Sequence, residues 1–98
     1  MITEIHCLPR PTGTDEERYA YVHAAIAVIE ASGLTFEVGA LGTTVEGEPD
    51  EVWPLLRRVH DACLAAGADS VITVIKVAQW AVPEGAPSIA SLTDRYRG

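Results

Sequence analysis

Basic side chains are scarce in this sequence of 98 residues, which holds 7 Lys and Arg against 14 Asp and Glu and carries a formal net charge of −7. Sequence-independent affinity for nucleic-acid phosphates comes from clustered Lys and Arg, so this balance argues against a nucleic-acid partner. Long hydrophobic runs are also lacking, because the longest uncharged stretch, Tyr19 to Ile29, is shorter than the roughly 18 apolar residues of a membrane span. Glu4 and His6 interrupt the start before the hydrophobic region of a signal peptide can form. We therefore expect a cytoplasmic protein that does not associate with membranes.

Motifs that mark disulfide frameworks, metal sites and catalytic centres are lacking as well. The two cysteines, Cys7 and Cys63, are far apart and form no C-x-x-C pattern, so we predict two reduced thiols. The three histidines fall on separate expected elements without the close spacing of a helical metal motif, and no glycine-rich phosphate loop is present. His6 and Cys7 are neighbours on an expected strand, so their side chains face opposite ways and cannot pair as base and nucleophile. The sequence therefore predicts no catalytic residues, no metal site and no cofactor.

The sequence does contain a regular series of strand and helix patterns. The expected elements are a strand at Ile2–Leu8, a helix from Thr14 to Gly33, strands at Leu34–Val38 and Leu41–Glu46, a helix from about Pro49 to Ala66, a strand at Ser70–Val77 and a short helix within Pro87–Tyr96. Pro9 and Pro11 end the first strand, because neither can donate to a ladder. A capping box of Thr14 and Glu17 opens the first helix, and Pro54 should cost a hydrogen bond or kink the second.

The order β-α-β-β-α-β predicts an α+β fold, the ferredoxin-like βαββαβ sandwich. In this fold a four-stranded antiparallel sheet carries both helices on one face, and a short C-terminal helix follows. We expect one domain over residues 1–98, with a core at 2–77 and a C-terminal extension at 78–98. Acylphosphatases use an Arg and an Asn for catalysis on the same architecture. This chain contains no asparagine, so that catalytic arrangement is excluded.

Three threonines fall where the sheet should be apolar. The residues Gly39-Ala40 predict a two-residue turn of type II′, which sets Phe36 opposite Thr43 and directs Thr43 to the helix-covered face. Thr3 and Thr73 fall on the same face by strand alternation. A buried hydroxyl without a partner costs on the order of 1–3 kcal/mol. Either these hydroxyls bond nearby backbone groups, as strand threonines often do, or they line a small pocket for a flat polar ligand.

The other face of the sheet is expected to be open. Ile72 and Val74 lie on it, and an exposed apolar sheet face is often covered by another subunit. By strand alternation the carboxylates of Glu4, Glu37 and Glu46 also lie on this face, where they have an ordinary explanation as solvated surface groups. His23 and His60 border the apolar stripes of their helices, where a packing role explains them without a ligand.

The segment LTFEVGALGTTVEG at residues 34–47 resembles the central signature of the YkoF-like, thiamine-binding protein family. That signature has a Tyr/Phe-Glu-aliphatic-Gly hairpin followed by Gly-Thr and Glu-Gly. Further matching positions are Glu4-Ile5 and Pro9 near the start, Asp50-Glu51-Val52, His60 with Ala62, and Val71, Thr73, Ile75 and Lys76. The resemblance covers residues 2–77. Departures from the family pattern are Pro54 within a helix, Arg10 in a loop where an aliphatic residue is usual, and the segment 79–83.

The resemblance implies a ferredoxin-like subunit that forms dimers or tetramers through its sheet faces or edges. It also implies binding of thiamine or its hydroxymethylpyrimidine part, without known catalysis. Thr43 and Thr73 are the matched hydroxyls, and Glu37 and Glu46 are the matched carboxylates. With Phe36 as an aromatic wall and the matched His60, the predicted ligand-binding residues are Thr43, Thr73, Glu37, Glu46, Phe36 and His60.

Three functions are compatible with these observations. The first is non-catalytic binding of thiamine or a pyrimidine precursor in a pocket between the sheet and the helices. The second is a structural or regulatory oligomerisation module with no small-molecule ligand. The third is an enzyme that acts on a small pyrimidine with Glu46 or His60 as the base, although no catalytic motif supports it.

Overall fold

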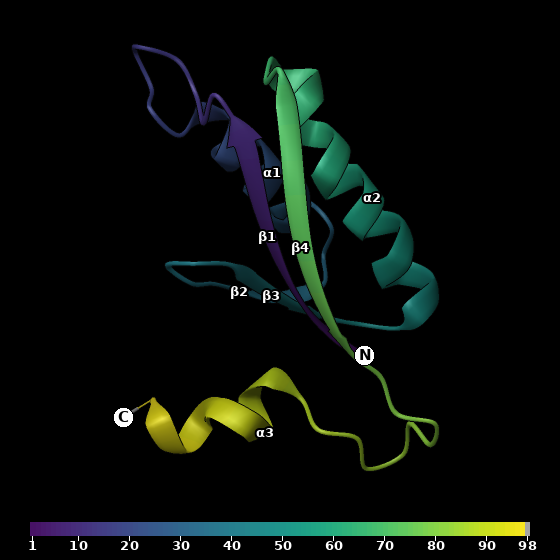
Figure 1. The fold of residues 1–98 in the computed structure, drawn as a ribbon. Coiled ribbons are helices and arrows are strands. Elements are labelled where there is room, and N and C mark those ends of the chain that lie inside the picture. The colour runs from purple at the N-terminus through teal and green to yellow at the C-terminus, as the bar shows by residue number, and fades with distance from the viewer. Residues whose placement is uncertain (98) are drawn as a thin grey trace.

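The expected strands form one four-stranded antiparallel sheet in the computed structural model, which describes residues 1–97 (Figure 1). The elements are β1 (Ile2–Arg10), α1 (Ala20–Glu30), β2 (Thr35–Val38), β3 (Thr43–Glu46), α2 (Pro49–Ala66), β4 (Ser70–Ala78), α3 (Ile89–Thr93) and a 3₁₀ turn at Asp94–Tyr96. The strand order is β2-β3-β1-β4, and α1 and α2 pack together on one face of the sheet. This arrangement is the predicted ferredoxin-like sandwich.

The first strand is longer than expected. Its predicted end at Leu8 is wrong, because β1 continues through Pro9 to Arg10 and pairs with β4 over its whole length. The ladder with β3 stops at Ile5, so β1 has a neighbour on only one side beyond that residue. Asp69 N donates to Arg10 C=O at 2.8 Å, so the backbone groups of Arg10 face β4 and those of Pro9 face the unpaired side. The proline therefore costs no ladder hydrogen bond.

The first helix begins later than expected. Thr14 and Glu17 close a separate turn, in which Thr14 Oγ1 accepts from Glu17 N at 3.1 Å and Thr14 N donates to Glu17 C=O at 2.8 Å. In a capping box the Glu17 carboxylate would accept a hydrogen bond from Thr14 N, but here Thr14 N already donates to Glu17 C=O. The Glu17 carboxylate instead lies 2.7 Å from His23 Nδ1. The predicted capping box at the helix start is therefore wrong, and α1 begins at Ala20.

The hairpin between β2 and β3 has a longer loop than the predicted two-residue turn. Gly39 N donates to Gly42 C=O at 2.8 Å, so residues 39–42 form the loop. Val38 is opposite Thr43 and Phe36 is opposite Val45, which makes the predicted register wrong by two residues. Side chains alternate with a period of two along a strand, so a slip of two residues leaves every side chain on its predicted face. Thr43 accordingly remains on the helix-covered side.

The second helix follows the prediction closely. It starts at Pro49 and ends against Gly67, whose φ of 130° is a backbone conformation that favours glycine. Pro54 lies inside α2 without ending it and leaves the carbonyl of Asp50 without its helical donor. The expected apolar stripe is buried, and its members are Val52, Leu55, Leu56, Val59 and Cys63. No helix within residues 1–97 has the length and apolar character of a membrane span.

The C-terminal segment lies on the outer face of the sheet, opposite α1 and α2. Ile89 at the start of α3 is buried, and its N–H donates to Glu46 Oε1 at 3.0 Å. Arg97 pairs with the carboxylate of Glu37 on β2. The outer face is therefore partly covered by the chain itself, whereas Ile72 and Val74 on β4 remain 62% and 55% exposed.

One buried hydroxyl yields a stability prediction. Thr3 is 0% exposed, and its Oγ1 has no hydrogen-bond partner within residues 1–97. Replacing it with the similarly shaped valine in Thr3→Val is expected to raise the free energy of unfolding by about 1–3 kcal/mol, because the unsatisfied polar group is removed. Urea denaturation checks this, with the exposed Thr35→Val as the matched control. Loss of stability in Thr3→Val alone would mean that the hydroxyl has a partner in solution.

Candidate functional site

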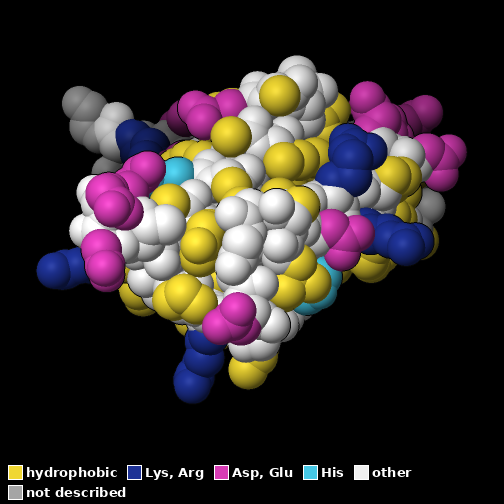
Figure 2. Space-filling model, turned by 90° about the horizontal axis from the view of Figure 1, so that it is seen from above, with side chains coloured by type: hydrophobic (Ala, Val, Ile, Leu, Met, Phe, Trp, Pro, Cys, Tyr) yellow, Lys and Arg dark blue, Asp and Glu magenta, His cyan; other side chains and the backbone are white. Residues whose placement is uncertain are grey.

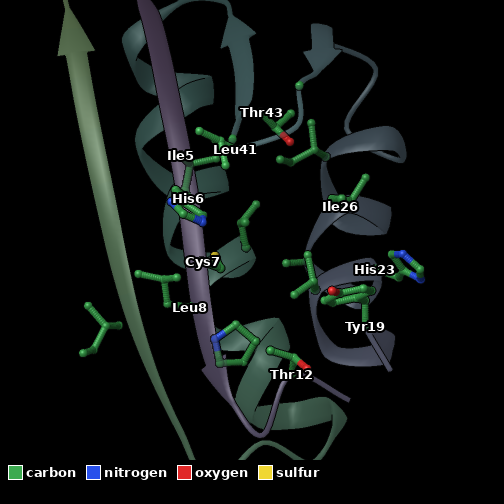
Figure 3. Close-up of a pocket in the computed structure, with 18 of the residues that line it drawn as sticks. Ile5, His6, Cys7, Leu8, Thr12, Tyr19, His23, Ile26, Leu41 and Thr43 are labelled. Atoms are coloured by element: carbon green, nitrogen blue, oxygen red, sulfur yellow. The ribbon is translucent and has the colours of Figure 1, made fainter. Parts of the chain in front are cut away.

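The short third strand opens a cleft beside β1. The cleft lies mainly on the helix-covered side of the sheet and extends to His6, Leu8 and Ile72 of the outer face. β3 begins at Thr43, opposite Ile5, so the part of β1 from Cys7 to Arg10 has no strand on that side. The first helix lies across this gap, and the space between them is a cleft of about 760 Å³. Figure 3 shows Ile5 to Leu8 of β1 on one side of it and Ile26 of α1 on the other.

The walls of the cleft are mainly apolar. Val22 and Ile26 of α1 line it and are only half-buried, because they face the gap instead of a packed sheet. Tyr19, just before α1, also lines the cleft and turns its hydroxyl toward β1 (Figure 3). The loop 39–42 and Thr43 close one end, and Thr12 lies at the other. An apolar cavity with a few placed polar groups is typical of small-molecule sites.

Thr43 is the one predicted ligand residue that lines this cleft. Its side chain is 4% exposed and on the inner face of β3, as its strand parity predicted. No side-chain hydrogen bond of its Oγ1 occurs within residues 1–97. The hydroxyl is therefore available to a molecule in the cleft.

Thr73 and His60 are instead joined in an internal network. His60 Nδ1 lies 2.6 Å from Thr73 Oγ1, which donates to Cys7 Sγ at 3.6 Å. Since the hydroxyl donates its hydrogen to the sulfur, its oxygen can accept from His60 in the tautomer that carries the ring hydrogen on Nδ1. This network connects α2, β4 and β1, and only Cys7 among its three members reaches the cleft.

Cys63 of α2 lies beneath the same network. Burial, together with the neighbouring Cys7 thiol, raises the pKa of the Cys63 thiol to about 12. The thiol is 0% exposed, so it stays protonated at neutral pH and serves as a core residue. Both cysteines are free thiols, as the sequence predicted.

The remaining predicted ligand residues lie away from the cleft. Phe36 packs against the core on the inner face of β2, opposite Val45. Glu37 and Glu46 are on the outer face, where Arg97 and the Ile89 amide contact them. Glu37 also lines a smaller cavity of about 280 Å³ between α3 and the sheet. The two carboxylates could therefore reach a ligand only from the outer side.

Sequence reasoning predicted none of the other residues that line the cleft, among them Tyr19 and Arg10. Tyr19 was predicted to lie within the first helix, yet it precedes α1 and is 50% exposed beside the cleft. Arg10 was predicted to lie in a loop, and it is the last residue of β1. The departure at Arg10 from the family pattern was the one available signal for it.

Acidic groups are kept out of the cleft despite the net charge of −7. Figure 2 shows hydrophobic side chains across the middle of the upper face and acidic side chains mainly toward its margin. The residues that line the cleft include Arg10 and no Asp or Glu within residues 1–97. In the same described range, no three His, Cys, Asp or Glu side chains gather as metal ligands.

Comparisons with known proteins identify relatives of this chain. A family described as "Thiamine-binding protein" matches residues 4–85. A UPF0045 protein of Clostridium perfringens is 34% identical over 67 residues, which are 68% of this chain and 70% of that protein. A solved domain of unknown function, DUF77, from Bacillus cereus is 34% identical, with a TM-score of 0.82 over 98% of this chain and 88% of that one. A Thermotoga maritima protein provisionally assigned to thiamine biosynthesis or salvage shares the fold, with 23% identity and a TM-score of 0.80 over 98% of this chain and 97% of that one.

Proposed function

Since the chain belongs to the thiamine-binding protein family, we propose that it binds thiamine or its hydroxymethylpyrimidine part, without chemical change, in the cleft between β1 and α1. The observation that carries this proposal is the Thr43 hydroxyl, which lies in the wall of a largely apolar cavity and has no side-chain hydrogen bond to any residue that the structure describes. The cavity volume of about 760 Å³ is within the range of small-molecule sites. The family is described by binding and not by a reaction, which agrees with a protein that is not an enzyme.

The two rings of thiamine suit different parts of this cleft. The aminopyrimidine is flat and uncharged, so it fits between apolar walls beside a hydroxyl. The thiazolium is a cation, and the face of the half-exposed Tyr19 ring is available for a cation–π contact. We therefore place the pyrimidine toward the Thr43 end of the cleft and the thiazolium beside Tyr19, toward the Thr12 end (Figure 3).

The other predicted ligand residues do not contact the ligand in this proposal. Thr73 and His60 hold Cys7 in position at the cleft wall through their hydrogen-bond network. Phe36 on β2 lies opposite Val45 of β3 and packs against the core, so it supports the strand that carries Thr43. Glu37 and Glu46 can contact a ligand only if the ligand reaches the outer face of the sheet.

Titration calorimetry with thiamine and with its pyrimidine precursor tests the proposal. Thr43→Val is expected to weaken binding about 10-fold, because one hydrogen bond to the ligand is lost while the shape of the site is kept. Thr44→Val, the neighbouring residue on the outer face, is the matched control and should bind as the parent does. Weaker binding in Glu37→Gln and Glu46→Gln with normal binding in Thr43→Val would move the site to the outer face.

A second candidate function is assembly without a small ligand. It is favoured by the exposed Ile72 and Val74 on the outer face of β4, which is an edge strand of the sheet. We propose that this surface forms dimers or tetramers of the chain in either case. A multimeric mass in sedimentation, together with no heat and no thermal shift at millimolar thiamine, would favour assembly alone.

A further inference from the structure

The main chain of Cys7 faces the cleft. Pairing of β1 with β4 runs without a break from Ile2 to Arg10, so the direction of the backbone groups alternates regularly along β1. Met1 C=O accepts from Gly47 N at 3.1 Å on the β3 side, and Arg10 C=O accepts from Asp69 N on the β4 side. By this alternation the N–H and the C=O of Cys7 both point to the β3 side, where the cleft lies.

Neither of these two backbone groups has a partner within residues 1–97. The ladder between β1 and β3 ends at the pair Ile5 and Thr43, and its next position would set Leu41 opposite Cys7. Leu41 has left the sheet for the hairpin loop and is 80% exposed. No turn, loop or side-chain hydrogen bond supplies a replacement for Cys7. Backbone groups in a cavity wall need a partner, which must be water or a ligand.

A donor and an acceptor that stand side by side select a complementary ligand edge. The N–H of an extended residue lies next to its own C=O, so the two groups match a ring nitrogen that is flanked by an exocyclic amine. We propose that the Cys7 main chain recognises this edge of an aminopyrimidine, with Cys7 N–H donating to the ring nitrogen and the amine donating to Cys7 C=O. The inference rests on the proposed function and specifies which part of the ligand determines its selectivity.

The two proposed hydrogen bonds to the Cys7 main chain predict that the protein binds an aminopyrimidine more tightly than an analogue of nearly the same shape. In the 4-oxo pyrimidine the amine is replaced by a carbonyl and the adjacent ring nitrogen carries a proton. Its acceptor would then meet Cys7 C=O and its donor would meet Cys7 N–H, so neither hydrogen bond forms. We expect the 4-oxo analogue to bind about 100-fold more weakly than the 4-amino compound, because two polar pairs are mismatched.

The variant Cys7→Pro tests the backbone donor directly. Proline removes the N–H on the unpaired side of β1, and Pro9 already occupies the equivalent side without loss of the strand. Cys7→Ala is the matched reference, because it also removes the thiol but keeps the N–H. We expect Cys7→Pro to bind the aminopyrimidine at least about 10-fold more weakly than Cys7→Ala. Equal affinities of two folded variants would overturn the inference.

Amide NMR on the parent protein covers the case in which Cys7→Pro does not fold. The Cys7 amide signal should shift on titration with 4-amino-5-hydroxymethyl-2-methylpyrimidine and stay in place with equal concentrations of the 4-oxo analogue. An unmoved Cys7 signal while the aminopyrimidine binds would overturn this inference and leave the proposed function standing. No binding of either thiamine or the aminopyrimidine would overturn both.

Discussion

Replacing Leu55 with alanine is expected to lower the free energy of unfolding by about 2–5 kcal/mol. Leu55 is 0% exposed in the middle of α2, in the same core cluster as Val45 of β3 and Ile29 of α1. The truncation removes apolar contacts and leaves a cavity that the surrounding sheet and helices cannot fill completely. A domain of this size has only about 5–15 kcal/mol of stability, so the loss is a large fraction of the total.

Urea denaturation followed by circular dichroism measures this effect. Leu64→Ala is the matched control, because Leu64 is on the same helix but 44% exposed, and its loss should stay within about 0.5 kcal/mol. Equal losses in the two variants would show that the inner stripe of α2 does not form the core in solution.

The stability of the protein is expected to fall steeply above pH 9 because of Cys63. Burial raises the pKa of this thiol from 9.0 to about 12 in the folded chain. Between these two values the folded state keeps a proton that the unfolded state has lost, so raising the pH favours unfolding. The contribution reaches about 1.4 kcal/mol for each pH unit in this window and disappears below pH 9, where both states are protonated.

Denaturation at a series of pH values from 7 to 12, under reducing conditions, checks this slope. Cys63→Ala lacks the thiol, so its stability should fall more gently in the same range. Packing lost in that variant shifts its stability by a constant amount, and the comparison therefore uses slopes and not absolute values. Parallel curves for the parent and Cys63→Ala would mean that the thiol titrates normally and is open to water.

The element order and the face of each strand residue were predictable from the sequence. Alternation along β1 and β3 placed Thr3, Thr43 and Val45 under the helices, and all three are buried. The predicted faces are correct although the predicted hairpin register is wrong. The register error is two residues, which is one full period of a strand. The apolar stripe of α2 was predictable for a similar reason, since its spacing is set by the helix itself.

Three local features differ from the prediction: the first depends on a distant strand, and in the other two the same short segment admits two competing turns. Pro9 stays in β1 because β3 is too short to reach it, and the sequence near Pro9 carries no information about the length of β3. Thr14 and Glu17 form a turn of their own, whose geometry competes with the capping box that the same residues suggest. The hairpin loop extends to Gly42, although Gly39-Ala40 alone suits a tighter turn.

The candidate site was predictable only in part. Strand parity directed Thr43 and Thr73 inward, and the family resemblance marked both as binding residues. Thr43 lines the cleft, whereas Thr73 bonds with His60 and Cys7 in an internal network and does not line it. Glu37 and Glu46 were predicted as ligand residues from the resemblance, while alternation had already put them on the outer face, where the structure has them. Their part in binding stays a prediction for the titrations above.

By itself, the sequence determined the ferredoxin-like order of elements, the two-sided character of the sheet and the inward direction of Thr43. Those properties follow from periods of two and of about 3.6 residues, which short stretches of chain set locally. Only the tertiary structure decided that a cleft exists, that Tyr19 lines it and that the Cys7 main chain faces it without a partner in the described part of the chain. The cleft arises where β3 ends before β1 does, and that difference in length depends on the docking of separate strands and of α1.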